Sequence, residues 1–415
     1  MKRLGGLASR RARLARAAAR LALGFGCACN AGVPQRSTAA PTGEPDSTAE
    51  PPGEPYPWQA RTRSPQPPEP ANDALAQACA KHDRALDRVA ALVASRDLSG
   101  RPPLDVDEIT DALRAEGAPY VWPHVWTLTG GPAPDAGARF GAWRSALPRV
   151  NEERCGTARV ATREHEVSVG LVVDVLADLE PLPTTAPVGA WVDVGARLLV
   201  PASAVQVLVL GPRGSSFGVP SSLEGNHVRA RFHADRPGAW LVQLLATVAG
   251  GPRPVAEARV FAGRAPSTLA PAAPAPGEMA GAGAAPADAL FAMVSGARAS
   301  EHVGALRRDA RLDRVARAHA EAMRAAGRLA HDADDGSPGD RVLSAGVNVA
   351  AVGENVAHAA DAAHAHRSLW RSPSHRANLL EASYDAVGIG VARDADATLW
   401  VCEVFAAIGR SGGSE

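Results

Sequence analysis

Three polar residues toward the C-terminal end have the types and local contexts from which a metal-binding or acid–base site can be built. His331 lies in the motif LAHD, Glu354 in GENVA and His375 in SPSHRANLL. Two imidazoles and one carboxylate match the ligand set of a zinc-type site that keeps an open coordination position. The same residue types also serve general acid–base chemistry, so residue types alone leave the reaction open.

The bulk composition limits the classes of function. At 415 residues the chain is long enough for two or three domains. Lys and Arg together number 44, as do Asp and Glu, so no basic surplus indicates a nucleic-acid partner. Aromatic residues make up only 4%, so the cores must be built mainly from Ala, Val and Leu.

Residues 1–32 are typical of a bacterial export signal. A long basic stretch precedes an apolar run, residues 21–31, that is too short to span a bilayer. We predict no transmembrane segment beyond this signal and a location in the cell envelope or outside the cell. Cys27 is a candidate lipoprotein attachment site, with ordinary cleavage near Ala31 as the alternative.

Two segments have the composition of linkers and divide the rest of the chain. Residues 33–72 are rich in Pro, Ser, Thr and Glu, and residues 264–287 are rich in Ala, Pro and Gly. Such compositions bury too little apolar surface to order themselves. The predicted folded regions are therefore 73–187, 188–263 and 288–410.

The first two regions differ in their hydrophobic periods. Apolar residues recur at helical spacing near residues 86–93 and 106–113, and a strand pattern follows after Val167. These patterns predict a helical to α+β domain at 73–187. Short alternating strands separated by turn signals predict an antiparallel β-sandwich at 188–263. Neither region shows a catalytic constellation. A degenerate copy of the C-terminal fold is one interpretation of 73–187.

The chain has five cysteines, two of which lie in the predicted signal. Cys79 and Cys155 could pair in an oxidising compartment. Cys402 lies in an apolar strand-like run and is expected to be a buried free thiol.

Residues 288–410 alternate between helix and strand patterns. Helices are predicted at 288–300, 309–326, 340–345 and 361–370, and the second should end at Gly327. Val387, Ile389 and Val391 alternate and predict a hairpin with the strand at 399–401.

The ordered motifs of this region resemble a known superfamily. The sequence LDRVARAHAEAM at 312–323, then LAHD, GENVA, SPSHRANLL and the strand VGIGV at 387–391 look like those of the CAP (SCP) superfamily. This superfamily comprises cysteine-rich secretory, antigen 5 and pathogenesis-related proteins, and the match is to its bacterial exported type, in the C-terminal domain only. The resemblance implies an α-β-α sandwich with a surface cleft.

The resemblance also implies a polar cluster in that cleft. His331, Glu354 and His375 would converge there and could hold a divalent metal such as zinc. Further residues expected in or around the cleft are Asn355, Ser374, Arg376, Asn378 and His319. The family's second glutamate is absent, because the corresponding stretch is WRS at 370–372, and Ser374 stands where glycine is usual.

Several of these residues also have structural interpretations. His319 lies on the apolar face of its helix and is expected to be a core histidine. Asn355 and Asn378 are suited to satisfying backbone groups, and Arg376 to pairing with a carboxylate. His366 is expected on the helix surface or around the site. No nucleophile elbow supports a serine hydrolase.

Three functional hypotheses follow. We favour a non-enzymatic ligand-binding module for a lipid or envelope component. The first alternative is a metal-dependent hydrolase acting on peptide or cell-wall polymer, in which metal-bound water would be the nucleophile. The second is a structural envelope scaffold. The ligand or substrate, the role of the β-sandwich and the oligomeric state stay open.

Overall fold

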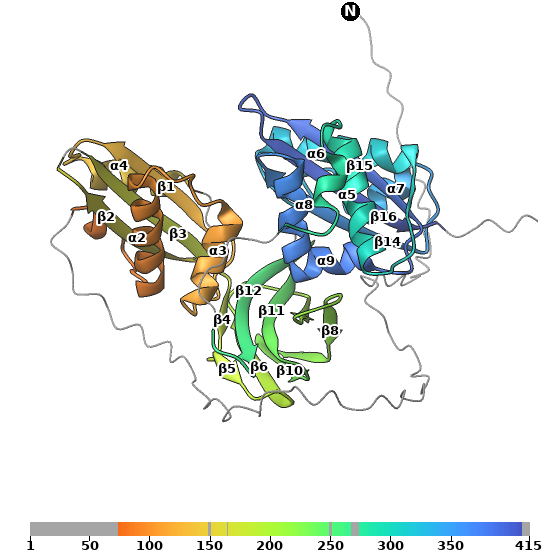
Figure 1. The fold of residues 1–415 in the computed structure, drawn as a ribbon, viewed down its shortest axis with the longest axis horizontal. Helices are drawn as coiled ribbons and strands as arrows, with labels where there is room; N and C mark the ends of the chain where they lie inside the picture. Colours follow the sequence, from red (N-terminus) through yellow and green to blue (C-terminus); the bar gives the residue numbers. More distant parts are fainter. Residues whose placement is uncertain (1–73, 148–150, 164, 249–250, 267–273, 409–415) are drawn as a thin grey trace, which may run out of the picture. The chain divides into compact units, whose positions relative to one another are not determined.

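The computed structural model describes residues 74–147, 151–163, 165–248, 251–266 and 274–408 (Figure 1). The predicted export signal at 1–32, its Cys27 and the predicted linker at 33–72 lie outside the described residues. Within the described ranges, no helix combines the length and the apolar character that crossing a membrane requires.

The region from Ala74 to Val175 packs helices against a three-stranded sheet of order β1-β3-β2. Its predicted helices and the strand after Val167 are present. Two elements between them, β1 and α4, were not predicted. The elements are α1 (Ala74–Gln77), α2 (Arg84–Leu98), α3 (Val106–Ala115), β1 (His124–Gly130), α4 (Ala136–Ala146), β2 (Glu152–Ala161) and β3 (Glu166–Val175).

A disulfide joins Cys79 to Cys155, a pairing that the sequence had left open, with a Cα–Cα distance of 5.9 Å. Cys155 lies on β2, which pairs with β3 in antiparallel register. On the other face of the sheet, alternate β3 residues from Val167 to Val175 pack against the apolar faces of α2 and α3. The disulfide therefore connects the segment before α2 to a sheet whose other face, packed against α2 and α3, is apolar.

The residues from Ala177 to Ala262 form two sheets of orders β4-β6-β10-β9 and β5-β12-β11-β7-β8. The predicted β-sandwich is present, but two short strands, β4 and β5, precede the predicted start at residue 188. β5 pairs in parallel with β12. The strands are β4 (Ala177–Leu179), β5 (Thr185–Ala186), β6 (Ala190–Leu198), β7 (Ala204–Leu210), β8 (Phe217–Val219), β9 (Ser221–Glu224), β10 (His227–Ala234), β11 (Gly238–Val248) and β12 (Gly251–Ala262).

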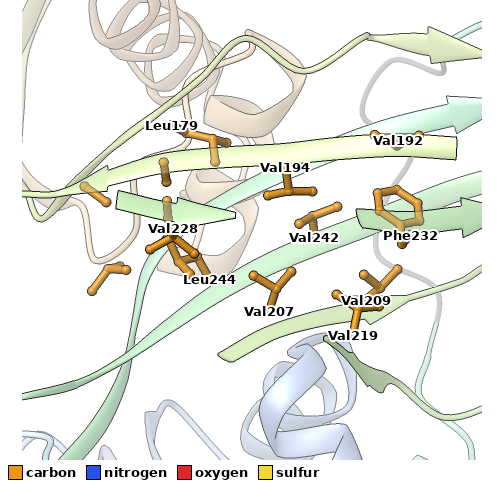
Figure 2. Packing of buried hydrophobic residues seen from close by; sticks show 14 of the residues in the cluster. Leu179, Val192, Val194, Val207, Val209, Val219, Val228, Phe232, Val242 and Leu244 are labelled. Atoms are coloured by element: carbon orange, nitrogen blue, oxygen red, sulfur yellow. The ribbon is translucent and has the colours of Figure 1, made fainter. Parts of the chain in front are cut away.

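The two sheets bury one shared apolar core. Val192 and Val194 on β6 and Phe232 on β10 face Val209 on β7 and Val242 on β11 (Figure 2). Inward residues alternate with outward polar ones along β10, as expected for a strand with one solvated face.

The C-terminal region is a four-stranded sheet of order β13-β15-β16-β14 with helices on both faces. This is the α-β-α sandwich that the resemblance implied. Its elements are η1 (Glu278–Gly281), α5 (Pro286–Ser300), β13 (Arg307–Arg308), α6 (Ala310–Ala326), α7 (Pro338–Ser344), β14 (Ala351–Ala359), α8 (Ala362–Arg371), α9 (Pro373–Leu380), β15 (Ala386–Arg393) and β16 (Leu399–Ala407). Helix α9 was not predicted from the sequence.

Helix α6 lies directly on β15, and glycine makes this approach possible. A Cβ atom at Gly388 would lie 2.1 Å from the backbone of Leu312, and one at Gly390 would lie 2.0 Å from that of Arg317. The α6 face from Leu312 to Met323 is buried there, as its helical period predicted. Gly327 ends α6 in a left-handed conformation with φ 59°, which glycine adopts without steric cost.

Part of the predicted second linker is packed against the C-terminal region. Glu278 on η1 is buried and forms an ion pair with Arg367 on α8. His366 Nε2 donates a 2.9 Å hydrogen bond to the Pro276 carbonyl. His366 is fully buried, so the expectation of a surface position was wrong, because residues 274–282 cover that face of α8.

The sheets of the first and last regions differ in strand number and order. The topology therefore gives no support to an internal duplication. The division of the chain into independent domains stays a prediction.

Candidate functional site

Three different elements bring the predicted site residues to the C-terminal sheet. His331 follows the end of α6, Glu354 lies on β14, and His375 lies in the first turn of α9. Side chains alternate between faces along β14, so Glu354 points to the α6 side and Asn355 to the side of α8 and α9. The site therefore has two halves, one on each face of the sheet.

The first half is centred on the Glu354 carboxylate, whose side chain is only 1% exposed. Its Oε1 lies 2.9 Å from His331 Nδ1, and its Oε2 pairs with the Arg341 guanidinium from α7. Burial alone would raise the pKa of Glu354, but the His331 hydrogen bond and the charges of His331 and Arg341 outweigh it and lower the pKa. Glu354 is thus an ionised, fully engaged carboxylate.

Arg341 also holds the loop that carries His331. Its guanidinium donates to the His331 carbonyl at 3.0 Å and to Asp335 Oδ1 at 3.2 Å. It also donates to the Gly336 carbonyl. One cation therefore fixes both the backbone of His331 and the carboxylate that orients its ring. Arg341 was not predicted as a site residue from the sequence.

His319 is the core histidine that the sequence predicted, and it also borders the cluster. It is fully buried on α6, with Nδ1 2.8 Å from Asp335 Oδ2 and Nε2 2.9 Å from the Ala330 carbonyl. The same Nε2 lies 3.7 Å from Glu354 Oε1. Both ring nitrogens are thus engaged, and His319 supports the loop before His331.

Cys402 closes the buried side of the cluster. The thiol is free and buried, as predicted, and donates to Glu354 Oε2 over 3.4 Å. Burial raises the pKa of the Cys402 thiol well above its usual value, and the neighbouring Glu354 raises it further. The sulfur therefore stays a neutral thiol and does not act as a nucleophile.

The second half of the site is an amide network. Asn355 Nδ2 donates to the His375 carbonyl and to Glu403 Oε2, each at 3.2 Å. Asn378 Nδ2 donates to the Glu354 carbonyl and to Asn355 Oδ1, each at 3.0 Å. The two asparagines satisfy backbone groups, as expected, and in doing so connect β14 to the helix that carries His375.

Glu403 is a buried acid that the sequence analysis did not identify. It lies on β16 opposite Asn355 and is fully buried. Its Oε1 has no hydrogen-bond partner within the described part of the chain. Burial raises the pKa of Glu403 to about 7, and the Asn355 hydrogen bond only partly offsets this rise. A single acidic residue in an apolar strand was the sequence signal available for it.

His375 has a half-buried ring near His331. Burial lowers the pKa of His375 well below its usual range, and the charge of His331 lowers it further. The imidazole is therefore neutral at physiological pH, in the state that can bind a metal or accept a hydrogen bond.

Two other predicted residues flank His375. The Arg376 guanidinium lies 3.8 Å from the centroid of the Trp370 ring and 3.5 Å from Glu301, so it does pair with a carboxylate. Ser374 Oγ lies 3.4 Å from Ser372 Oγ. No hydrogen bond joins either serine to the His375 ring within the described residues, so the geometry offers no Ser–His nucleophile pair.

The donor set can be tested for fit to a divalent metal. Glu354 is engaged by His331 and Arg341, and no group of three or more His, Cys, Asp or Glu side chains in the described ranges is arranged to hold a metal ion. However, when a histidine binds a metal through Nε2, its Nδ1–H usually donates a hydrogen bond to a carboxylate or a similar acceptor. His331 and His375 are therefore the candidate ligands, and Glu354 would have the orienting role.

Cavities of ligand size lie elsewhere. Two cavities of 460 and 550 Å³ occur in the described part of the chain, and neither is lined by His331, Glu354 or His375. The surface cleft implied by the resemblance stays a prediction.

Comparison with solved structures gives similarities at low identity. An SCP-domain extracellular protein from Bacillus anthracis is 16% identical, with 56% of this chain and 86% of that chain covered and a TM-score of 0.27. A cysteine-rich secretory protein from Staphylococcus aureus is 12% identical, with 64% and 89% covered and a TM-score of 0.26. An outer surface protein from Borrelia burgdorferi is 18% identical, with 29% and 90% covered and a TM-score of 0.28.

Sequence comparison addresses the C-terminal region directly. No curated protein sequence matches the chain. The sequence profile of the CAP family, described as the cysteine-rich secretory protein family, matches residues 291–404. This range contains α6, β14, α9 and the His331, Glu354 and His375 cluster. The C-terminal region of this chain is a CAP domain of the cysteine-rich secretory protein family.

Proposed function

We propose that this chain is an exported bacterial binding protein whose CAP domain uses the His331 and His375 imidazoles to hold an envelope-derived ligand, with lipid as the first candidate. The observation that carries the proposal is the Glu354–Arg341 pair, which orients His331 from inside the fold. Burying two opposite charges costs desolvation energy that apolar residues would avoid. A pair that orients an imidazole with 24% of its side chain exposed is better explained by binding than by stability.

Export is supported by two independent features. The Cys79–Cys155 disulfide is the kind of crosslink that persists in oxidising compartments. The sequence of residues 1–32 is typical of an export signal. Lipid attachment at Cys27 belongs to the same proposal and would place the protein at the cell envelope.

The binding proposal can be tested with lipid vesicles. The full chain should co-sediment with vesicles of phosphatidylethanolamine and phosphatidylglycerol and should retain extractable lipid after purification. His331→Ala should reduce both, whereas His364→Ala should not, because His364 is exposed on α8 and pairs locally with Asp361. Equal lipid recovery from all three proteins, or none from any, would remove the lipid proposal.

A second candidate is divalent metal binding within the same site. The Glu354 contact to His331 Nδ1 favours Nε2 as the metal-binding atom, and His375 supplies a neutral imidazole. A bound metal would supply Lewis-acid polarisation of a ligand oxygen. Dialysis of the full chain against zinc, followed by elemental analysis, measures this directly.

Hydrolysis of peptide or wall polymer is the alternative that the geometry favours less. Cys402 is a neutral thiol, Glu354 is engaged by Arg341, and Ser374 makes no hydrogen bond to the His375 ring in the part of the chain that the structure describes. A hydrolase would still need a general base, and the neutral His375 imidazole is the group suited to that role. Wall-polymer cleavage that His375→Ala abolishes would establish this alternative over the binding proposal.

The remaining alternative is a structural scaffold. In that case the cluster would contribute only to stability. Metal removal would then lower the unfolding temperature without changing the recovery of lipid.

A further inference from the structure

The β-sandwich has a groove of its own, away from the CAP-domain cluster. Its cavity volume is 550 Å³, within the range of small-molecule sites, and it is lined only by residues between Trp191 and Trp240. We call it the aromatic groove and define it by Trp191, Phe217, Arg213, Arg231, His233 and the buried Trp240. It is built from the outward face of β6 and β10 on one side and the β7–β8 connection and β8 on the other.

Two large apolar side chains of this groove face solvent. Trp191 on β6 is 53% exposed and Phe217 on β8 is 44% exposed. They belong to different sheets, yet they line the same cavity. A concave surface that exposes several apolar side chains is a binding surface more often than an average part of the protein surface is.

The exposed indole is held in place by its neighbours. Trp191 pairs in register with His233 on β10, and the two ring centroids are 5.0 Å apart. His233 Nε2 in turn lies 2.9 Å from the Gly189 carbonyl. Because its contacts already restrict the indole, little rotamer entropy is lost when a ligand ring stacks on it.

Arginines surround the aromatic surface. The Arg231 guanidinium lies 5.1 Å from the centroid of the Trp191 ring and 3.2 Å from Asp193. Arg236 pairs with Asp235, whereas Arg213 makes no ion pair with any residue that the structure describes. The groove therefore has one cation beyond its internal pairs, and a guanidinium is well suited to a carboxylate.

We propose that the aromatic groove binds an acidic polysaccharide, with sugar rings stacked on Trp191 and Phe217 and a uronate carboxylate paired with Arg213. The C–H face of a pyranose is apolar, so stacking removes apolar surface from water on both partners. The single surplus cation of the groove can pair with one uronate carboxylate while the sugar rings stack on the aromatic side chains. Single-stranded nucleic acid fits less well, because the groove has one cation outside its internal pairs and not the row of cations that follows a phosphate backbone.

Affinity electrophoresis of the full chain provides the test. The native gels contain polygalacturonate, alginate or hyaluronate, and parallel gels contain neutral dextran, polyphosphate or oligothymidylate. We expect retardation by at least one uronate polymer and none by dextran. Trp191→Ala and Arg213→Gln should each weaken that retardation at least tenfold. Both side chains are exposed, so neither change should prevent folding.

A matched control lies on β10, the strand that also carries Arg231 of the groove. Arg229 is on β10, pairs with Glu180 at 2.6 Å and does not line the groove, so Arg229→Gln should bind as the wild type does. The proposal is overturned if no uronate polymer retards the protein, or if Arg229→Gln and Trp191→Ala behave alike. It is equally overturned if polyphosphate or oligothymidylate retards the protein as strongly, because general attraction to anions or binding of nucleic acid would then explain the retardation.

Discussion

The first and the last regions of the chain both pack helices on a largely antiparallel sheet, but they bury different chemistry. In strands β1 to β3, Ser168 is the buried polar residue among the described side chains. In the C-terminal sheet, Glu354, Asn355 and Glu403 are all buried, and His319 on α6 lies 3.7 Å from Glu354. Buried charges reduce stability unless they are paired, so their concentration in one sheet indicates where binding or chemistry takes place.

The two regions also differ in how they are held together. The first uses a covalent bridge between Cys79 and Cys155, which leaves its sheet free to be apolar. The last uses the Arg341–Glu354 pair and the Asn355–Asn378 network in the place of apolar packing. The comparison predicts that changes in the first region affect only stability, whereas changes in the last affect stability and binding.

Removal of the disulfide should have the largest effect. The double change Cys79→Ser and Cys155→Ser opens a loop with a sequence separation of 76 residues. Loop-closure entropy then predicts a loss of about 4 kcal/mol in the unfolding free energy. Urea unfolding followed by circular dichroism measures it, and a reducing agent should have no further effect on the variant. A loss of ligand or metal binding in this variant while it stays folded would break the comparison.

Glu354→Ala should lower the unfolding free energy somewhat less, by about 3 kcal/mol. This is the lower end of the range for breaking a buried ion pair. Arg341 would lose its buried partner but keep Asp335 and two carbonyls. Urea unfolding measures the cost, and binding of the ligand or metal should weaken as well, because His331 loses the group that orients it. A normal affinity in this variant would show that orientation of His331 is not needed.

Glu403→Gln should stabilise the protein in a pH-dependent way. The folded state raises the pKa of Glu403 from 4.5 to about 7, so it favours the protonated acid. The wild type therefore has its full stability below pH 4.5 and loses part of it as the pH rises through 7. The glutamine variant avoids this loss, and we expect a gain of about 3 kcal/mol at pH 8 and almost none at pH 4.5. Thermal unfolding at both pH values checks this, and an equal gain at both would refute it.

The smallest change in unfolding free energy is expected at an exposed ion pair of the C-terminal region. Arg317 and Glu321 pair on the solvent side of α6, with side chains 72% and 51% exposed. Glu321→Ala should change the unfolding free energy by less than about 0.5 kcal/mol. A cost similar to that of Glu354→Ala would mean that burial does not distinguish the two pairs.

Periodicity and turn signals predicted much of the C-terminal fold. The α6 face, its end at Gly327 and the β15–β16 hairpin follow from local patterns that the tertiary structure reinforces. Helix α9 was not predicted because its sequence, with a proline at its first position and few apolar residues, lacks a helical stripe. β1 and α4 were missed for a related reason, since α4 has little apolar periodicity.

The candidate site could be predicted only in part. Motif context indicated His331, Glu354 and His375, but the roles of Arg341 and Glu403 depend on contacts between residues far apart in the sequence. Arg341 reaches Glu354 from another element, and Glu403 meets Asn355 only through strand register. Such pairings arise from the assembled sheet, so a local pattern can mark one residue, as it does Glu403, but does not identify its partner.

The measurement that tests the central claim most directly is zinc content and unfolding free energy on the same samples of the full chain. The wild type is compared with His331→Ala/His375→Ala and with the exposed-residue control His364→Ala. We predict about one zinc per chain in the wild type and the control, and none in the double variant. The metal-free double variant should be about as stable as the metal-free wild type. Equal zinc in all three proteins, or none in any, would contradict the assignment of these imidazoles to one binding site.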